Sequence, residues 1–238
     1  MGRVFEKRKH KMFARYAKMA KAFTKLGREI VIAVKAGGPN PDLNSRLRAI
    51  MQNAKSINMP KDRIDSAIKR ASEKDSATYE EVIYEGYGPH KVPMLIECAT
   101  DNPNRTVANL RMYFTRSEGG ALATSGAVSF LFDRKAVFRI NAAGLNKDEV
   151  EFDLIDYGAE EYTWDDESKE LIIQTSFNDY GSMQKALEDK KYEVKESSKI
   201  FIPNTVKELT DEQEPDLQAL IDKLDEDDDV LAVYHNAQ

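Results

Sequence analysis

The chain has 238 residues, of which 41% are hydrophobic and 32% charged, which is typical of a soluble globular protein of one to three domains. A single cysteine, Cys98, excludes an intrachain disulfide. The charged N-terminus lacks the apolar core of a secretory signal, and no apolar run approaches the roughly 18 residues that span a membrane, so we expect a cytoplasmic protein.

The charge is divided between the two ends of the sequence. Residues 1–74 hold nineteen Lys and Arg against six Asp and Glu, a net of +13, whereas residues 75–238 hold sixteen against thirty-five, a net of −19. A basic end of this kind points to a polyanion, and nucleic acid is the first candidate because cations that neutralise phosphates release counterions. The alternative is a basic face that pairs with the acidic remainder of the same chain.

Residues 3–28 have the pattern of an amphipathic helix. At 100° per residue, the apolar side chains between Phe5 and Ile30 fall on one side and the cations on the other. A face of cations without interleaved carboxylates is costly unless an anion is near. A break near Phe23, with Thr24 starting a second helix, is left open. The candidate nucleic-acid contacts on this face are Lys7, Lys11, Arg15, Lys18, Lys21, Lys25 and Arg28, with Arg3 at its start.

Two shorter helices are expected to complete a basic, all-α domain. Gly37-Gly38-Pro39 ends the first segment, and Asn40 is expected to cap the next helix with Pro41 at its first position. A further helix follows Pro60 and ends near Ser72. Arg46, Arg48 and Lys61 join the candidate nucleic-acid contacts, and Arg63, Lys69 and Arg70 add to the positive surface.

The acidic remainder predicts two α/β units. Residues 79–87 and 92–100 read as strands, a helix is expected from about residue 103, and residues 128–132 read as another strand. Residues 137–202 then follow the order βαββαβ, which matches a ferredoxin-like split βαβ unit. A helix and strand at 217–234 cannot bury an apolar face alone, so we expect them to return to the first unit.

These patterns predict an α+β multidomain protein: a basic helical domain followed by two α/β domains, one ferredoxin-like and inserted in the other. The predicted boundaries are 1–74, 79–133 together with 205–238, and 134–204.

Catalytic and metal-binding patterns are missing from the sequence. The three histidines fall in different predicted units, and no His/Cys pair has zinc-ligand spacing. No Walker, GxSxG or HExxH motif occurs, and Cys98 lies in an apolar strand, where it is expected to be buried and inert. We therefore expect no enzyme, no catalytic residue, no metal, no cofactor and no small-molecule substrate.

A polar cluster marks the junction of the second strand and the following helix. Helix N-termini gather backbone N–H groups that can bind an anion or polar partner, and capping of the helix is the simpler interpretation. The candidate contact residues here are Thr100, Asp101, Asn102, Asn104, Arg105 and Thr106.

Several segments, taken together, resemble the YebC/PmpR family, often named "probable transcriptional regulatory protein", which has a mitochondrial relative that activates translation of cytochrome oxidase subunit I. They span the chain in family order: residues 21–30, 44–48, 58–62, 84–89 (YEGYGP), 100–106 (TDNPNRT) and 228–236. The start departs from the family's GHSKW, since Gly2 is followed by Arg3-Val4, and His90-Lys91 replaces a glycine-rich turn.

The resemblance implies a cytoplasmic three-domain protein with one of two functions. One is DNA-binding transcription regulation, for which Asn44, Arg46 and Arg48 would read base edges in the major groove. The other is translation regulation at the ribosome, relieving stalls at proline-rich stretches through contacts with RNA shape and backbone. Both predict nucleic acid, DNA or ribosomal RNA, as the partner, and neither requires a membrane.

Overall fold

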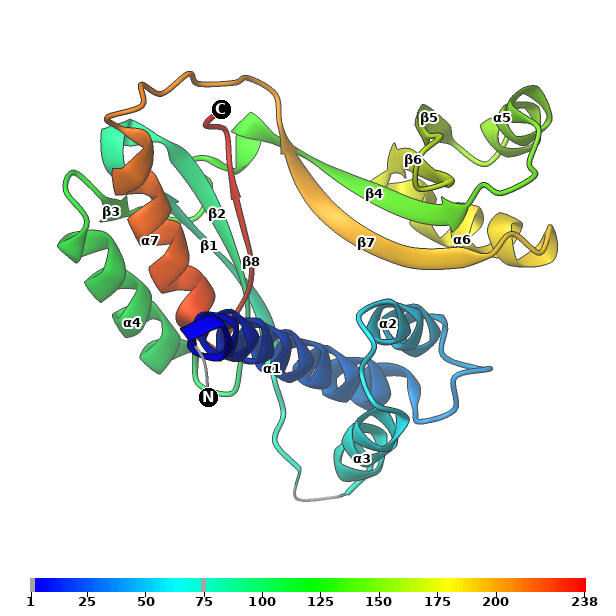
Figure 1. Cartoon of the computed structure of the whole chain (residues 1–238), viewed down its shortest axis with the longest axis horizontal. Coiled ribbons are helices and arrows are strands. Elements are labelled where there is room, and N and C mark those ends of the chain that lie inside the picture. Colours follow the sequence, from blue (N-terminus) through cyan, green and yellow to red (C-terminus); the bar gives the residue numbers. More distant parts are fainter. Residues whose placement is uncertain (1–2, 74–75) are drawn as a thin grey trace.

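The computed structural model describes the backbone of residues 3–73 and 76–238. It describes the side chains and their surroundings from Lys18 onward, within the same ranges. Three helices come first, and two four-stranded antiparallel sheets with helices of their own follow (Figure 1). The expected α+β multidomain fold is thereby confirmed. Among the described residues, no helix is long and apolar enough to cross a membrane.

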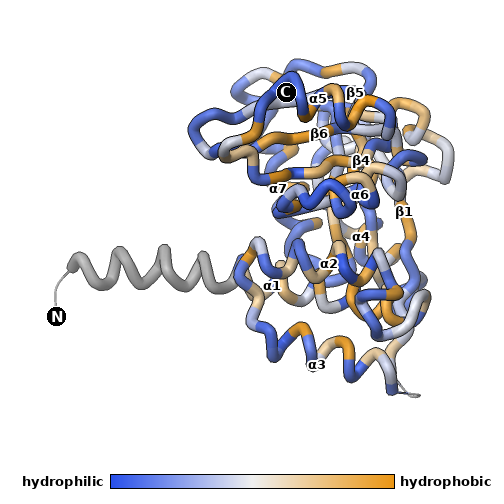
Figure 2. Tube along the Cα trace, turned by 90° about the vertical axis from the view of Figure 1, so that its right-hand side faces the viewer, coloured by the Kyte–Doolittle hydropathy of each residue, from blue (hydrophilic) through white to orange (hydrophobic). Residues whose placement is uncertain are grey.

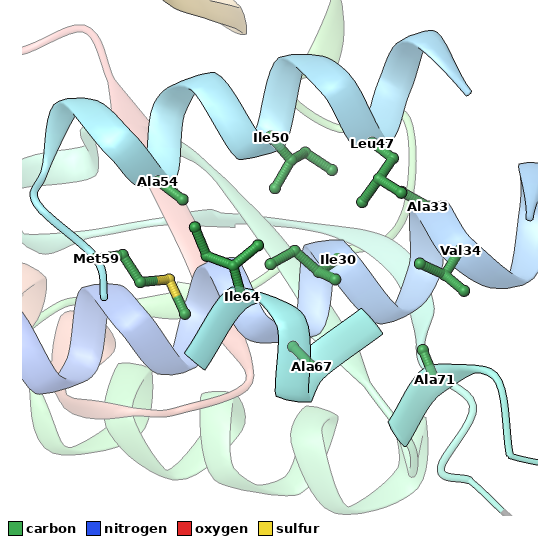
Figure 3. Packing of buried hydrophobic residues seen from close by; sticks show 10 residues of the cluster. All are labelled: Ile30, Ala33, Val34, Leu47, Ile50, Ala54, Met59, Ile64, Ala67 and Ala71. Atoms are coloured by element: carbon green, nitrogen blue, oxygen red, sulfur yellow. The ribbon is translucent and has the colours of Figure 1, made fainter. Parts of the chain in front are cut away.

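The helical domain is built on one long helix. Helix α1 spans Arg3–Gly37 without a break at Thr24 and ends where Gly38 adopts a φ of +85°, a conformation that glycine adopts without a steric penalty. Helices α2 (Ser45–Ser56) and α3 (Lys61–Ala71) pack against it. Figure 3 shows the core where the three meet, formed by Ile30, Ala33, Val34, Leu47, Ile50, Ala54, Met59, Ile64, Ala67 and Ala71.

The start of α2 differs from the prediction. Asn44, not Asn40, is the N-cap, and its Oδ1 accepts a hydrogen bond from the Leu47 amide at 3.0 Å. The Asn44 Nδ2 also donates to the carbonyl oxygens of Ala33 and Gly38. Asn44 therefore caps α2 in place of Asn40, because its buried side chain binds the first turn of α2 and also fixes the turn to the end of α1.

The first sheet has the strand order β3-β1-β2-β8. Its strands are β1 (Glu80–Tyr87), β2 (Pro93–Thr100), β3 (Ala121–Leu122) and β8 (Val230–His235). Helices α4 (Pro103–Arg116) and α7 (Glu214–Glu226) cover one face, where Met94, Ile96 and Cys98 alternate along β2. The C-terminal helix and strand thus complete the sheet that residues 80–100 begin.

The second sheet has the order β5-β6-β4-β7 and the chain order βαββαβ of a ferredoxin-like unit. Its elements are β4 (Phe132–Asn141), α5 (Lys147–Ile155), β5 (Ala159–Asp165), β6 (Glu170–Ser176), α6 (Tyr180–Asp189) and β7 (Val194–Pro203). The long strands β4 and β7 pair side by side and lead from the first sheet to the inserted domain (Figure 1). Hydrophobic residues follow β4 and β6 in Figure 2.

The expected strand at residues 128–132 is wrong. Ser129–Leu131 forms a 3₁₀ turn, and Phe132 begins β4. The buried Glu85 carboxylate accepts hydrogen bonds from the amides of Gly126, Val128 and Ser129 at 2.7, 2.7 and 3.0 Å. Burial raises the pKa of Glu85, but these hydrogen bonds outweigh it and lower the pKa below its usual value. Amides turned toward one carboxylate cannot at the same time pair in a ladder.

Strain is expected in the turn between β1 and β2. His90 and Lys91 have φ values of 58° and 60°, in the left-handed region that side chains with a Cβ disfavour. Asp216 Oδ2 lies 2.9 Å from His90 Nε2, and Lys207 Nζ donates to the His90 carbonyl oxygen. These contacts hold His90 in place, whereas Lys91 is exposed.

We expect Lys91→Gly to raise the free energy of unfolding by about 0.5–1 kcal/mol, because glycine adopts this φ without a clash. Urea denaturation at pH 7 measures the change. Lys69→Gly, at an exposed position inside α3, is the control and should lower the free energy of unfolding by about 0.5–1 kcal/mol. A loss of stability in Lys91→Gly would contradict the prediction.

Candidate nucleic-acid interface

The last part of the cationic face of α1 meets the acidic end of α7. Lys25 Nζ lies 3.4 Å from Asp225 Oδ1, and Arg28 pairs with Asp229. The pKa of Glu226 is lowered mainly by Lys223, and Lys21 contributes. For Lys25 and Arg28, the basic face therefore pairs with the acidic remainder of the same chain, which was the alternative interpretation of the charge pattern.

Asp229 is the centre of this contact. It is 3% exposed and accepts hydrogen bonds from Thr106 Oγ1 at 2.7 Å, Arg105 Nη2 at 3.0 Å and Thr100 Oγ1 at 3.2 Å, besides Arg28. The Arg28 Nη1 also donates to the Ala99 carbonyl oxygen at 2.7 Å. Burial raises the pKa of Asp229, but the hydrogen bonds from Arg28, Thr106 and Arg105 outweigh it and lower the pKa to about 2.

The polar cluster at residues 100–106 belongs to the same junction. Asn102 Oδ1 caps α4 by accepting from the Arg105 amide at 3.1 Å, and Thr100 Oγ1 accepts from the Asn102 amide at 3.0 Å. Arg105 bridges Asp229 and Asp101, with half of its side chain exposed. Asn104 is exposed. Capping and internal pairing therefore account for most of the cluster.

Helix α2 lies between α1 and the inserted domain. Its Arg46 pairs with Glu81 of β1, and the Arg48 guanidinium binds both carboxylate oxygens of Glu188 at 2.9 and 3.1 Å. Asn53 exchanges two hydrogen bonds, at 2.7 and 2.9 Å, with the backbone of Ser197. Asn44 is buried, and Arg46 and Arg48 are engaged inside the chain although their side chains are about a third exposed. The pairing does not favour base reading by Asn44, Arg46 and Arg48, which stays a prediction.

Several cations of the helical domain remain in solvent. Among the described residues, seven exposed side chains form no ion pair, and these are Lys18, Lys35, Lys55, Lys61, Arg63, Lys69 and Arg70; Lys35 donates instead to the Ser76 carbonyl oxygen and the Thr78 hydroxyl. Of the predicted contacts, this set retains Lys18 and Lys61, while the side chains of Lys7, Lys11 and Arg15 lie outside the described ones. Arg63 packs over the Phe23 ring, so α3 runs beside the middle of α1.

Two hollows flank α1. One, of about 420 Å³, lies between α1, α2, β8 and β7 and is lined by both acidic and basic side chains. Burial and the neighbouring Glu97 raise the pKa of Glu29 there to about 7. The other, of about 530 Å³, lies between α1 and α3 and contains Arg28, Arg63 and Arg70. Arg63 and Arg70 were counted in the positive surface but not in the predicted site, although their spacing of seven residues puts them on one helix face.

Cys98 is buried in β2, as expected, and its pKa is raised by burial. Within the part of the chain that the structure describes, no three His, Cys, Asp or Glu side chains are grouped to hold a metal ion.

The fold and the surface charge therefore define the class of protein: a three-domain α+β protein with a basic helical domain. Residues 3–74 match the family model described as the TACO1/YebC protein N-terminal domain, and residues 79–237 match the TACO1/YebC second and third domain. The chain belongs to the TACO1/YebC family, which confirms the resemblance seen in the sequence.

Relatives of similar length support this membership. Over 238 residues and 100% of both chains, the sequence is 49% identical to a "probable transcriptional regulatory protein" of Flavobacterium psychrophilum. A relative of the same name from Cytophaga hutchinsonii is 54% identical over 236 residues, which are 99% of this chain and 98% of the relative. The crystal structure of a conserved hypothetical protein from Aquifex aeolicus is similar with a TM-score of 0.77 at 35% identity, covering 93% of this chain and 91% of that one.

We expect Asp229→Asn to lower the free energy of unfolding at pH 7 by about 2 kcal/mol, because the depressed pKa of Asp229 is itself a stability contribution of that size. The folded-state pKa lies below the ordinary value of 3.8, so the contribution is present above about pH 4 and is lost as the pH falls toward 2.

Urea denaturation at pH 7 and at stepwise lower pH measures this effect. Asp225→Asn is the control, since Asp225 is 57% exposed and its pair with Lys25 should contribute less than about 0.5 kcal/mol. Equal losses in the two variants at pH 7 would contradict the prediction, and so would an undiminished loss in Asp229→Asn at pH 2.

Proposed function

We propose that the protein is a nucleic-acid-binding regulator of gene expression, and that its helical domain contacts the phosphate backbone. The exposed, unpaired cations on α1 and α3 are the observation that carries this proposal. No carboxylate of the described chain balances their charge, whereas Lys25, Arg28, Arg46 and Arg48 are paired with carboxylates. The names of the relatives, which describe transcriptional regulators, support the same class of function.

Transcription regulation requires binding to duplex DNA. The pairing of Arg46 and Arg48 with carboxylates of the same chain argues against reading of base edges by α2, so contacts with DNA would be made mainly to phosphates. Such contacts fix position and add affinity but carry little sequence information. Sequence preference would then have to come from the shape or deformability of the duplex.

Translation regulation at the ribosome is the second candidate, and the same pairing of the α2 arginines favours it. A protein that binds through backbone contacts suits RNA, which is recognised largely by shape, phosphates and 2′-hydroxyl groups. The body of the protein, with a net charge of −19 over residues 75–238, is repelled by a long duplex but could face solvent or a basic protein.

Sedimentation with ribosomes and retention on genomic DNA at the same physiological salt distinguish the two candidates. Ribosome profiling after gene deletion is the cellular counterpart: pausing at proline-rich codons supports translation, and altered mRNA levels with a footprint on one promoter support transcription.

We expect the triple variant Lys18→Gln, Lys61→Gln, Lys69→Gln to bind DNA and RNA more weakly, by a similar factor for all sequences. Each lost phosphate contact should reduce the slope of log K against log salt by about 1, so the slope should fall by up to about 3. Fluorescence anisotropy across a salt series measures both quantities.

A matched control is Lys91→Gln, Lys147→Gln, Lys223→Gln, which removes the same charge from exposed positions on the two α/β domains. This control should change the salt slope by much less. If both triple variants reduced affinity and slope equally, binding would depend on net charge and the assigned surface would be wrong.

The paired arginines of α2 give an independent test. We expect Arg48→Gln to lower the free energy of unfolding by about 1 kcal/mol, because a bidentate pair with Glu188 is lost. Affinity and sequence preference for duplex DNA should stay within about twofold of the parent protein.

Thermal denaturation and binding to a set of duplexes measure the two effects, with Lys55→Gln on the same helix as the stability control. Selective loss of affinity for one duplex sequence in Arg48→Gln would show that α2 reads bases after all.

A further inference from the structure

The hollow between α1 and α3 has the lining of an anion site. It measures about 530 Å³, within the range of about 300–1,000 Å³ for small-ligand sites. Ser76, Ala77 and Tyr79, which follow α3, close one side of it. Among the described residues that line it, three are arginines and none is acidic. Its occupant should therefore carry negative charge.

Two of the three arginines have a charge that nothing in the described chain neutralises. Arg28 pairs with the buried Asp229, so its charge is already balanced. Arg63 and Arg70 are exposed and form no ion pair with a described residue. On α3, positions 63, 66 and 70 follow the i, i+3, i+7 spacing of one face. Arg63, Ser66 and Arg70 therefore present two cations and a hydroxyl along one wall.

Apart from the hydroxyls of Thr24 and Ser76, the rest of the groove is lined by apolar and aromatic residues. Gly27, Val31, Met59 and Ala67 contribute apolar surface, and no side chain projects from Gly27. The Arg63 guanidinium lies 5.6 Å from the centre of the Phe23 ring, and the Arg28 guanidinium lies 5.1 Å from that of Tyr79. Nucleobases stack on aromatic rings and on guanidinium planes of this kind.

We propose that this groove binds one unpaired nucleotide of a nucleic-acid strand, with its phosphate between Arg63 and Arg70 and its base against Phe23 and the apolar floor. The proposal rests on the proposed function and adds that a nucleotide free of base pairing is recognised. A base-paired nucleotide cannot enter, because its two faces and its pairing edge are covered within the duplex. An inorganic anion would make no use of the apolar floor.

The test compares hairpins that differ by a single bulged nucleotide. The bulge carries 2-aminopurine, whose fluorescence falls on stacking, and the hairpins are prepared as RNA and as DNA. We expect the bulged hairpin to bind about tenfold more tightly than the fully paired one, which corresponds to the lower part of the range for one base stack. Protein binding should also quench the 2-aminopurine.

Two double variants of α3 separate the groove from the general positive surface. Arg63→Gln, Arg70→Gln should reduce the tenfold preference to less than twofold. Lys61→Gln, Lys69→Gln removes the same charge from α3 positions outside the groove and should weaken both hairpins equally, keeping the preference. Phe23→Leu, which keeps an apolar side chain, should reduce the quenching, with circular dichroism showing that the helices remain.

The outcomes keep the two proposals apart. If no hairpin binds, the proposed function fails. If both hairpins bind equally, or the two double variants behave alike, the groove proposal alone is overturned. Tighter binding of an oligoglutamate peptide than of the bulged hairpin would also overturn it, since that would identify an acidic protein as the occupant. RNA and DNA arms that differ identify which strand chemistry the groove accepts.

Discussion

The arrangement of the domains depends on one buried carboxylate. Asp229, directly before β8, accepts hydrogen bonds from Arg28 of the helical domain and from Thr100, Arg105 and Thr106 around the start of α4. A carboxylate out of water is stable only when it is paired, so loss of these partners would leave a buried charge uncompensated. The last strand of the chain therefore holds the first helix against the first sheet.

A second set of contacts fixes the inserted domain. Asn53 and Arg48 of α2 bind Ser197 and Glu188, which belong to β7 and α6. Glu85 fixes the turn from which β4 leads to the inserted domain by accepting from three amides. The domains are thus held to one another by directional polar contacts. The charged hollow beside Glu29 lies where the three domains meet.

These contacts decide how much of the basic end is available to a partner. The net charge of +13 over residues 1–74 suggests a continuous cationic surface. In the folded chain, Lys25, Arg28, Arg46 and Arg48 are paired with carboxylates from the acidic remainder. Four of the remaining cations lie on α3, with Lys18, Lys35 and Lys55 elsewhere in the domain, and Arg63 and Arg70 line a groove that combines cations with aromatic rings. The interpretation that the basic face pairs with the acidic remainder therefore holds for these four residues, and binding of nucleic acid by the others stays a proposal.

The sequence by itself determined the element order and the family. Periodicity placed α1, α3, α7 and the βαββαβ order. A helix that buries one face repeats its apolar residues about every 3.6 residues, and a strand does so every 2 residues. It missed the cap at Asn44 and the turn at Ser129–Leu131, since both are fixed by side chains that contact distant backbone. Which cations are free was decided only by tertiary structure. Both Arg28 and Arg63 lie on basic helical segments of the sequence. Only Arg28 is ion-paired, because the fold brings Asp229, 201 positions away, to Arg28.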